Sequence, residues 1–485
     1  MASLQSFSII LLTIYVILIV SSSLFSKKSD SIEGYFLANR SLSFLALAIT
    51  FIASWWGAGS AIETADHSYQ NGISAFWIYG MPVLFSTGLL FVFARAIRKV
   101  GSITQPQLLE ERYGKAPALM LSILIFLFMT ITAASQIVGI GIFFEKFLHL
   151  DYTMSALIGT GIVLLYSFFG GFKAVVRTDI IQFIFLLSAS ILVFAYAYYY
   201  SGGISAIKTI ADTKQLTYYF SFTHQLSSNM VYIITFGSAW MIQANVWQRI
   251  SAARSPQDAR KMIGLSFLVY IPLYLMVTFT GMLALGLFEE MPQGGIISGI
   301  INDYMPPFLG ALIFVGICSA IMSTMDSLIN TGAMVLCVDI YKNRFRPEAT
   351  QKQLLIVGKI GTIIVTLIAL LIGLEIKSIL KVSWLAADLL STGAFVPLIL
   401  GFIWKRGTTI GAMSSMLFGT IFSLYNLTVA LGAKLPLPWE IGTAKHVLIG
   451  MLGSSLVYLI ASLLSKAETI KSESFIHKAN LKHNS

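Results

Sequence analysis

Thirteen apolar stretches, each near the roughly 20 residues that cross a lipid bilayer, constrain this chain more than any other feature. They cover residues 4–24, 43–65, 73–94, 117–144, 153–172, 179–200, 228–248, 262–288, 307–337, 354–374, 379–403, 410–430 and 446–465. Only 11% of the 485 residues are charged, against about 25% in soluble domains. A soluble chain of this composition would expose large apolar patches. The sequence therefore predicts an all-α membrane protein with about 13 transmembrane helices, forming one multi-pass domain over residues 1–485.

The positions of the basic residues predict the orientation of these helices. If the N-terminus is outside, the inside loops and the stretch ends next to them hold 25 of the 32 Lys and Arg residues, and the outside loops and their stretch ends hold 7. An excess of Lys and Arg is typical of the cytoplasmic loops of membrane proteins. The first stretch, residues 4–24, has no basic residue before it and is followed by Lys27 and Lys28. A signal peptide has the opposite arrangement, so we expect an extra N-terminal helix over 4–24 and a C-terminus in the cytoplasm.

Other compositional features exclude two further classes of protein. The net charge of +10 does not indicate a nucleic-acid partner, because the basic residues lie in short loops between apolar stretches. The two cysteines, Cys318 and Cys337, lie in or next to one apolar stretch, which favours packing over a disulfide framework or a zinc site. The Lys-rich segment 466–485 is predicted to be a solvated, partly disordered cytoplasmic tail.

Two of the stretches carry helix-breaking residues near their centres. The second contains Ser54-Trp55-Trp56-Gly57-Ala58-Gly59-Ser60, and the seventh contains Thr235-Phe236-Gly237-Ser238-Ala239-Trp240. Small residues also serve close helix packing, but breaks at matching positions, five stretches apart, are typical of transporters built from inverted repeats. We therefore predict a first repeat over 43–200, a second over 228–403, and two C-terminal helices over 410–465. Unwound backbone at a break frees carbonyl oxygens for a small cation.

The ninth stretch adds polar side chains that suit such a cation. Ser323 and Thr324 supply adjacent hydroxyl oxygens, which are hard ligands, although such hydroxyls often bond their own backbone. Asp326 follows on nearly the same helix face, and an intramembrane carboxylate usually marks an ion or proton path. Asp179 is either a cap of the sixth stretch or a group on an ion's exit path.

Taken together, these motifs resemble the sodium:solute symporter family, which contains sodium/proline, sodium/pantothenate and sodium/glucose symporters. The resemblance runs from Asn39-Arg40-Ser41-Leu42 through the thirteenth stretch. The length and the number of stretches are closest to the sodium/proline branch. The most specific motifs are Gly170-Gly171 with Thr178-Asp179 and Gln182, then Gln243 with Gln248-Arg249, then Ala320, Ser323-Thr324, Asp326-Ser327 and Asp339-Ile340-Tyr341-Lys342.

The resemblance implies a five-plus-five inverted repeat (LeuT-like fold), alternating access, and a bacterial inner or other plasma membrane. It implies a sodium site made by the carbonyls of Ala53, Trp56 and Ala320 and the hydroxyls of Ser323 and Thr324, with Asp179 on the inner sodium path and Asp326 as a candidate ion or proton site. It further implies a substrate pocket at Gly57, Ser60, Thr132, Gln136, Phe236, Trp240 and Gln243. Phe236 and Trp240 lie one helical turn apart, so we expect both to close over the substrate. It also implies sodium as the coupling ion, and no cofactor is expected.

The sequence departs from the sodium/proline branch at two positions. Trp55 stands where that branch has an aspartate, and Thr132 stands where it has a tyrosine. These departures argue against proline, and the polar residues of the sugar-binding branch are mostly absent. An amino acid or another small organic acid is therefore the preferred substrate.

Three other functions would each require features that differ from those of sodium symport. A proton-coupled carrier would use Asp326 or Asp179 and would respond to pH rather than sodium. A membrane sensor would need a soluble signalling domain, for which the segment 466–485 has no room. An enzyme is not expected, because the nearest acid–histidine pair, Glu63 and His67, has no third partner in the sequence.

Overall fold

The computed structural model describes residues 3–24, 31–169, 172–430 and 432–479, and within these ranges every named element is helical. The long helices are α1 (Leu4–Leu24), α5 (Gly80–Val100), α7 (Lys115–Leu148), α8 (Tyr152–Phe169), α9 (Phe172–Ser201), α14 (Pro256–Leu283), α16 (Pro307–Met334), α17 (Gln351–Glu375), α20 (Thr409–Ala430) and α21 (Ala444–Leu464). Three further spans consist of consecutive shorter pieces: α3 (Phe44–Ala53), η2 (Gly59–Glu63) and α4 (Thr64–Asn71); α11 (Leu226–Tyr232), η4 (Ile233–Gly237), α12 (Ser238–Met241) and α13 (Ala244–Ser251); and α18 (Ile379–Leu390), η7 (Ser391–Phe395) and α19 (Val396–Ile403). The connecting helices are α2 (Ile32–Leu37), η1 (Ala38–Arg40), η3 (Gly72–Trp77), α6 (Gln105–Tyr113), α10 (Gly203–Thr213), η5 (Ala284–Gly286), α15 (Ile296–Tyr304), η6 (Val335–Phe345) and α22 (Thr469–Ala479).

Each of the thirteen predicted stretches coincides with helix, but not all of them are long continuous helices. Ten helical segments of the described chain are long and apolar enough to cross a membrane. The other three predicted spans are 43–65 and 228–248, which are broken, and 153–172, which corresponds to a shorter apolar helix. The spans 43–65 and 228–248 are not among the ten, because their backbone unwinds within the span and leaves helical pieces too short to cross a membrane.

Local sequence sets several of the helix starts. The hydroxyl of Ser43 accepts a hydrogen bond from the Ala46 N–H at the start of α3, and Thr104 caps α6 in the same way. Thr350 and Gln353 form a reciprocal capping box at the start of α17. These side chains satisfy N–H groups that the first turn of a helix leaves without partners.

The break in the second span lies where the sequence predicts it. Helix α3 ends at Ala53, and helical structure resumes as the π-helical turn η2 at Gly59. The intervening residues include Trp55 and Trp56, both buried. Unwound backbone at this depth is tolerated only where protein groups satisfy it.

The break in the seventh span lies further along the chain than predicted. Residues 235–240 remain helical, with a π-helical turn over Ile233–Gly237. The helix is interrupted instead at Ile242 and Gln243, where Gln243 adopts an extended conformation. Gly237 serves packing, because a Cβ atom there would lie 2.7 Å from the Phe85 ring.

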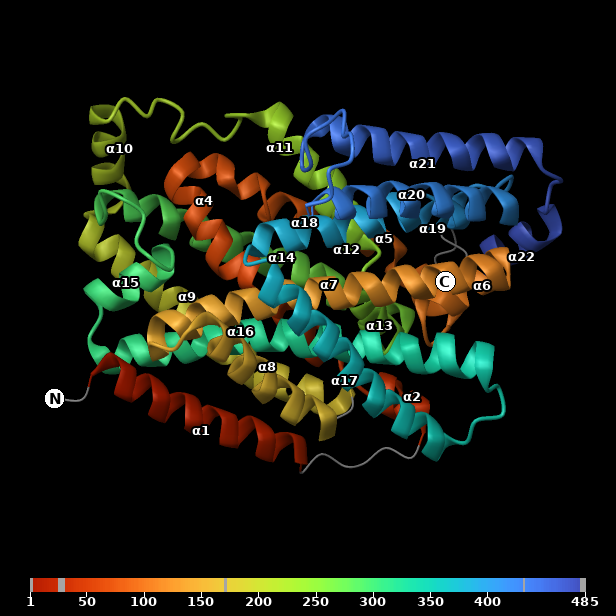
Figure 1. Ribbon diagram of the computed structural model, residues 1–485, viewed down its shortest axis with the longest axis horizontal. Coiled ribbons are helices and arrows are strands. Elements are labelled where there is room, and N and C mark those ends of the chain that lie inside the picture. Colours follow the sequence, from red (N-terminus) through yellow and green to blue (C-terminus); the bar gives the residue numbers. More distant parts are fainter. Residues whose placement is uncertain (1–2, 25–30, 170–171, 431, 480–485) are drawn as a thin grey trace.

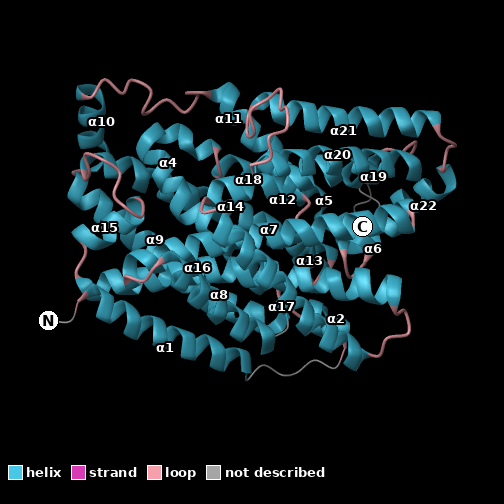
Figure 2. Cartoon of the chain, viewed as in Figure 1, coloured by secondary structure: helices cyan, strands magenta, loops and turns pink. Residues whose placement is uncertain are grey.

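The helices run roughly alongside one another, with α7 and α16 in the middle (Figures 1 and 2). In the most apolar window of α16, 83% of the residues are buried, against 28% for α1, so α16 is central and α1 faces outward. Helices α10 and α15 lie at the left of Figure 1, and α6 and α22 lie at the right. We call the end with α6 and α22 the inner end, because the charge bias predicts that it faces the cytoplasm.

Part of the C-terminal segment is ordered against the helical body, contrary to the prediction of a solvated tail. Residues 469–479 form α22, and Phe475 is buried with its ring 5.3 Å from that of Phe402. The hydroxyl of Ser472 donates to the carbonyl of Lys405, and Lys478 pairs with Glu111. The apolar side of a short helix provides enough burial to dock a segment that is otherwise rich in charge.

Candidate functional site

The predicted sodium ligands from two distant helices meet at the end of α3. The hydroxyl of Ser323 lies 2.8 Å from the carbonyl oxygen of Ala53, and that of Thr324 lies 3.4 Å from the same oxygen. Thr324 is also 3.2 Å from the carbonyl oxygen of Ala320. Four of the predicted ligands therefore lie together at the break. Such a set of hydroxyl and carbonyl oxygens suits a small hard cation.

The fifth ligand of the predicted set, the carbonyl of Trp56, belongs to the unwound stretch itself. Trp56 is fully buried, and its indole lies against the ring of Tyr274 at 4.9 Å between centroids. Trp56 lies three residues after Ala53, so this contact anchors the unwound stretch to α14.

Asp179 lies in a buried ion pair close to this site. It accepts a hydrogen bond from the hydroxyl of Thr50 and lies 3.3 Å from Nη2 of Arg249, and both ionic side chains have no exposed surface. Asp179 lies seven residues inside α9, so the interpretation as a helix cap is wrong. The neighbouring motif Gly170-Gly171 lies outside the described residues.

Asp326 belongs to the same buried cluster. Its Oδ1 atom accepts a hydrogen bond from Ser327, whose hydroxyl in turn accepts one from Nη2 of Arg249 at 2.8 Å. Asp326 is fully buried on α16, two residues after Thr324. The guanidinium group of Arg249 thus contacts Asp179 directly and reaches Asp326 through Ser327. Both carboxyl groups lie beside the predicted sodium ligands.

An internal cavity adjoins the sodium ligands and holds most of the predicted pocket residues. It contains about 500 Å³ of empty space, a figure that includes open solvent at its mouth. Its walls comprise Ser54, Trp55, Gly57, Gly59, Ser60, Tyr79, Val83, Thr132, Gln136, Trp240, Gln243, Thr324 and Ser383. Thr324 therefore faces the cavity and also belongs to the predicted ion site.

Hydrogen bonds connect the two breaks across this cavity. The indole N–H of Trp55, in the first break, donates to Oε1 of Gln243, in the second, at 2.9 Å. Oε1 of Gln136 accepts from the N–H of Ala58, also at 2.9 Å. The hydroxyls of Ser60 and Tyr274 are 2.6 Å apart. Groups that a membrane span would leave unsatisfied are paired here by side chains.

Phe236 does not line the cavity, contrary to the prediction. Its ring is fully buried and stacks on Trp240, with centroids 5.0 Å apart and an interplanar angle of 2°. Tyr79 stacks on both rings, at 5.6 and 5.7 Å. Trp240 and Tyr79 form the aromatic wall, and Phe236 supports it from behind.

Several residues of the cavity wall were not predicted from the sequence. Tyr79, Val83 and Ser383 come from spans that carry no local motif. One indirect signal is Gly59, because a Cβ atom there would lie 2.5 Å from the Tyr79 ring. Spacing along the chain does not reveal this contact, since it joins two different spans.

We expect Gly57→Ala to weaken sodium binding about tenfold, because overpacking of a tight site typically costs 1–3 kcal/mol. The added Cβ would lie 2.3 Å from Oε1 of Gln136 and 3.0 Å from Oγ1 of Thr324. Radioactive sodium binding to the purified protein measures the effect. Gly161→Ala is the matched control, because no atom lies within 4 Å of its added Cβ; equal affinities in the two variants would contradict this account of Gly57.

Comparisons with known proteins find similar sequences over most of the chain. The sequence model of the sodium:solute symporter family matches residues 35–419. The high-affinity proline transporter PutP of Bacillus subtilis (strain 168) is 27% identical over 414 residues, covering 81% of this chain and 86% of PutP. The human sodium/myo-inositol cotransporter 2 is 24% identical over 479 residues, covering 87% of this chain and 70% of the cotransporter.

Among solved structures, a Na⁺-coupled sialic acid symporter in a substrate-bound, outward-open state has a TM-score of 0.80. The match covers 95% of this chain and 98% of the symporter at 19% identity. A likeness at this identity shows the fold, and it confirms the predicted all-helical, LeuT-like fold class.

Proposed function

This chain belongs to the sodium:solute symporter family, and from that premise we propose that it couples inward sodium flow to uptake of a small organic solute by alternating access. It is a multi-pass membrane protein of a transporter family. In this proposal the repeats span 43–200 and 228–403, sodium is the coupling ion, and the C-terminus lies in the cytoplasm. The membrane is a plasma membrane or a bacterial inner membrane.

The observation that carries the proposal is the position of Thr324. Its hydroxyl lies among the predicted sodium ligands, while the residue also lines the cavity. An ion at this position would contact Ala53 at the end of α3 and Ser323 on α16. It would thereby fix the start of the unwound stretch that forms one wall of the cavity. Binding of the ion and of the solute would each favour the same conformation, which is the requirement for coupling.

The driving force is adequate for accumulating a dilute nutrient. One sodium ion crossing a potential of about 100 mV contributes roughly 2.3 kcal/mol. A tenfold sodium gradient adds about 1.4 kcal/mol. Together they support accumulation of about 500-fold.

The chemistry of the cavity limits the solute. Among the described residues that line it there is no Asp, Glu, Lys, Arg or His, and the polar groups are hydroxyls, amides and two indoles. A free carboxylate on the solute would find the bound sodium ion and the N-terminal turn of η2, which starts at Gly59 beside the cavity and carries the positive end of a helix dipole. We therefore propose an amino acid or a small organic acid as the solute.

Uptake into proteoliposomes under an imposed inward sodium gradient tests this proposal. We expect one member of a labelled panel of amino acids, small organic acids and polyols to accumulate only with the gradient and to leak out when an ionophore dissipates it. Potassium replaces sodium in the control vesicles. Accumulation driven by a pH gradient in the absence of sodium would overturn the proposal in favour of a proton-coupled carrier.

The proton-coupled alternative has one structural observation in its favour. The buried cluster holds two carboxyl groups, Asp179 and Asp326, and one guanidinium group, Arg249. A bound proton or a bound sodium ion would each balance the remaining negative charge. The proteoliposome experiment separates these two cases.

A further inference from the structure

Helix α6 connects the first half of the chain to three separate segments of the second half at the inner end. Nε2 of Gln105 donates to the carbonyl of Ile242 at 2.9 Å. The hydroxyl of Thr104, which caps α6, donates to Oδ1 of Asp339 at 2.6 Å. The buried guanidinium of Arg112 donates to three carbonyls near the end of α19, those of Gly401, Trp404 and Gly407. Any opening of the inner end that separates the two halves has to break these contacts.

The contact of Gln105 is the one that reaches the break in the seventh span. In a continuous helix the N–H of Val246 would bond the carbonyl of Ile242, but here it bonds Gln243. The break therefore leaves the Ile242 carbonyl free, and the Gln105 amide satisfies it. Gln105 is 4% exposed, so this hydrogen bond forms where water competes little with it.

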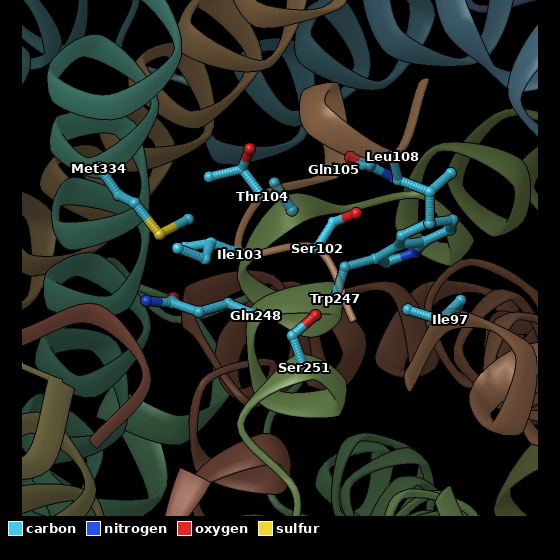
Figure 3. Close-up of a pocket in the computed structure, with 11 residues that line it drawn as sticks. Ile97, Ser102, Ile103, Thr104, Gln105, Leu108, Trp247, Gln248, Ser251 and Met334 are labelled. Carbon is cyan, nitrogen blue, oxygen red and sulfur yellow. The ribbon is translucent and has the colours of Figure 1, made fainter. Parts of the chain in front are cut away.

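The break also separates two cavities. Gln243 lines the solute cavity, while the next residue, Ala244, lines a second cavity on the other side. Figure 3 shows that second cavity, with Gln105 of α6, Trp247, Gln248 and Ser251 of α13, and Met334 of α16 around it. Its empty space of about 270 Å³ includes open solvent. The short segment at Ile242 and Gln243 is thus the partition between the two spaces, and Gln105 holds it in place.

We propose that Gln105 is the latch of the inner gate, a positioning residue that holds the partition closed while the solute is bound, and that the second cavity is the space into which the solute is released. This inference rests on the proposed transport function. Release of the Gln105 hydrogen bond lets the segment at Ile242 and Gln243 move, which joins the two cavities. The polar groups of Gln105 and Ser251 then offer hydrogen bonds to a solute that leaves toward the inner end.

Cysteine accessibility tests the latch without knowledge of the solute. One reporter, Ser251→Cys, lies in the second cavity, and the other, Ser383→Cys, lies in the solute cavity. The native cysteines are buried, so the parent protein gives the background rate of reaction with a maleimide. We expect Gln105→Leu and Gln105→Glu to accelerate labelling at position 251 about two- to tenfold, the effect of one net hydrogen bond, and to slow labelling at position 383.

The opposite responses of the two reporters distinguish a latch from general loosening, which would accelerate both. Gln5→Leu is the matched control, because Nε2 of Gln5 also donates to a backbone carbonyl, that of Leu148, at 2.9 Å, but at the other end of the molecule. Unchanged labelling at position 251 in whichever Gln105 variant folds, or an equal change in the Gln5 variant, would overturn the proposal. Repeating the labelling with and without sodium separates this question from the transport proposal: a latch effect without any sodium response supports the gate while contradicting sodium coupling.

Discussion

Replacing Ser323 and Thr324 with alanine together is expected to weaken sodium binding about 100-fold or more. Each hydroxyl oxygen is a ligand in the predicted site, and a polar contact to a charged group contributes about 1.5–3 kcal/mol. Both hydroxyls meet the Ala53 carbonyl in the structure, so their loss removes the contribution of α16 side chains to the site. Binding of radioactive sodium to the purified protein measures the loss.

The control for this experiment removes two buried hydroxyls that have no role in the proposed site. Thr362 and Thr366 on α17 donate to carbonyls of their own helix, those of Gly358 and Thr362. The variant Thr362→Ala/Thr366→Ala should bind sodium like the parent. Saturable, parent-like binding in the Ser323→Ala/Thr324→Ala variant would exclude the proposed sodium site.

Much of the fold follows from the sequence because a bilayer imposes a simple length rule on apolar stretches. Segments such as 354–374 and 410–430 agree with α17 and α20 to within a few residues. The break at Ser54 to Gly57 was also predictable, since small residues and hydroxyls interrupt an apolar run there. The convergence of Ala53, Ser323 and Thr324 was predicted from family resemblance, and the structure places these residues together.

The second break shows why composition alone misplaces such features. Gly237 suggested an interruption, yet this glycine makes room for Phe85, and the helix continues to Met241. The actual break, at Ile242 and Gln243, contains neither glycine nor proline. It is maintained by partners from distant segments, Gln105 and Trp55. Tertiary contacts therefore determine its position, and these have no signature in the local sequence.

The aromatic wall and the C-terminal helix were mispredicted for related reasons. The one-turn spacing of Phe236 and Trp240 predicted that both rings would close over the solute, but only Trp240 lines the cavity, and Phe236 stacks on it from behind. The Tyr79 ring, which stacks on both, was not predicted. The charge of the segment 466–485 suggested a solvated tail, but one buried aromatic residue, Phe475, docks α22 on Phe402. Few buried contacts suffice to order a short segment, so composition is a weak guide there.

The largest effect on stability is expected from breaking the buried pair of Asp179 and Arg249. Arg249→Leu should lower the free energy of unfolding by about 3–5 kcal/mol, because it leaves a buried carboxylate without its partner. The cost should exceed that of Asp179→Asn, since Arg249 also reaches Asp326 through the hydroxyl of Ser327. After Asp179→Asn the guanidinium keeps this second carboxyl group, whereas after Arg249→Leu both carboxyl groups lose their positive partner.

A double-mutant cycle measured by chemical or thermal unfolding in detergent gives the coupling between the two residues. The variant Asp179→Asn/Arg249→Leu should be less destabilised than the sum of the single variants, because Asp179→Asn removes one of the two buried carboxyl groups that Arg249→Leu leaves without a positive partner. Lys405→Ala/Glu473→Ala is the matched control, because this ion pair has side chains that are 60% and 55% exposed and exposed pairs contribute only about 0–1 kcal/mol. Additive losses at Asp179 and Arg249, or a smaller loss for Arg249→Leu than for Asp179→Asn, would contradict the view that one guanidinium group balances both carboxyl groups beside the ion site.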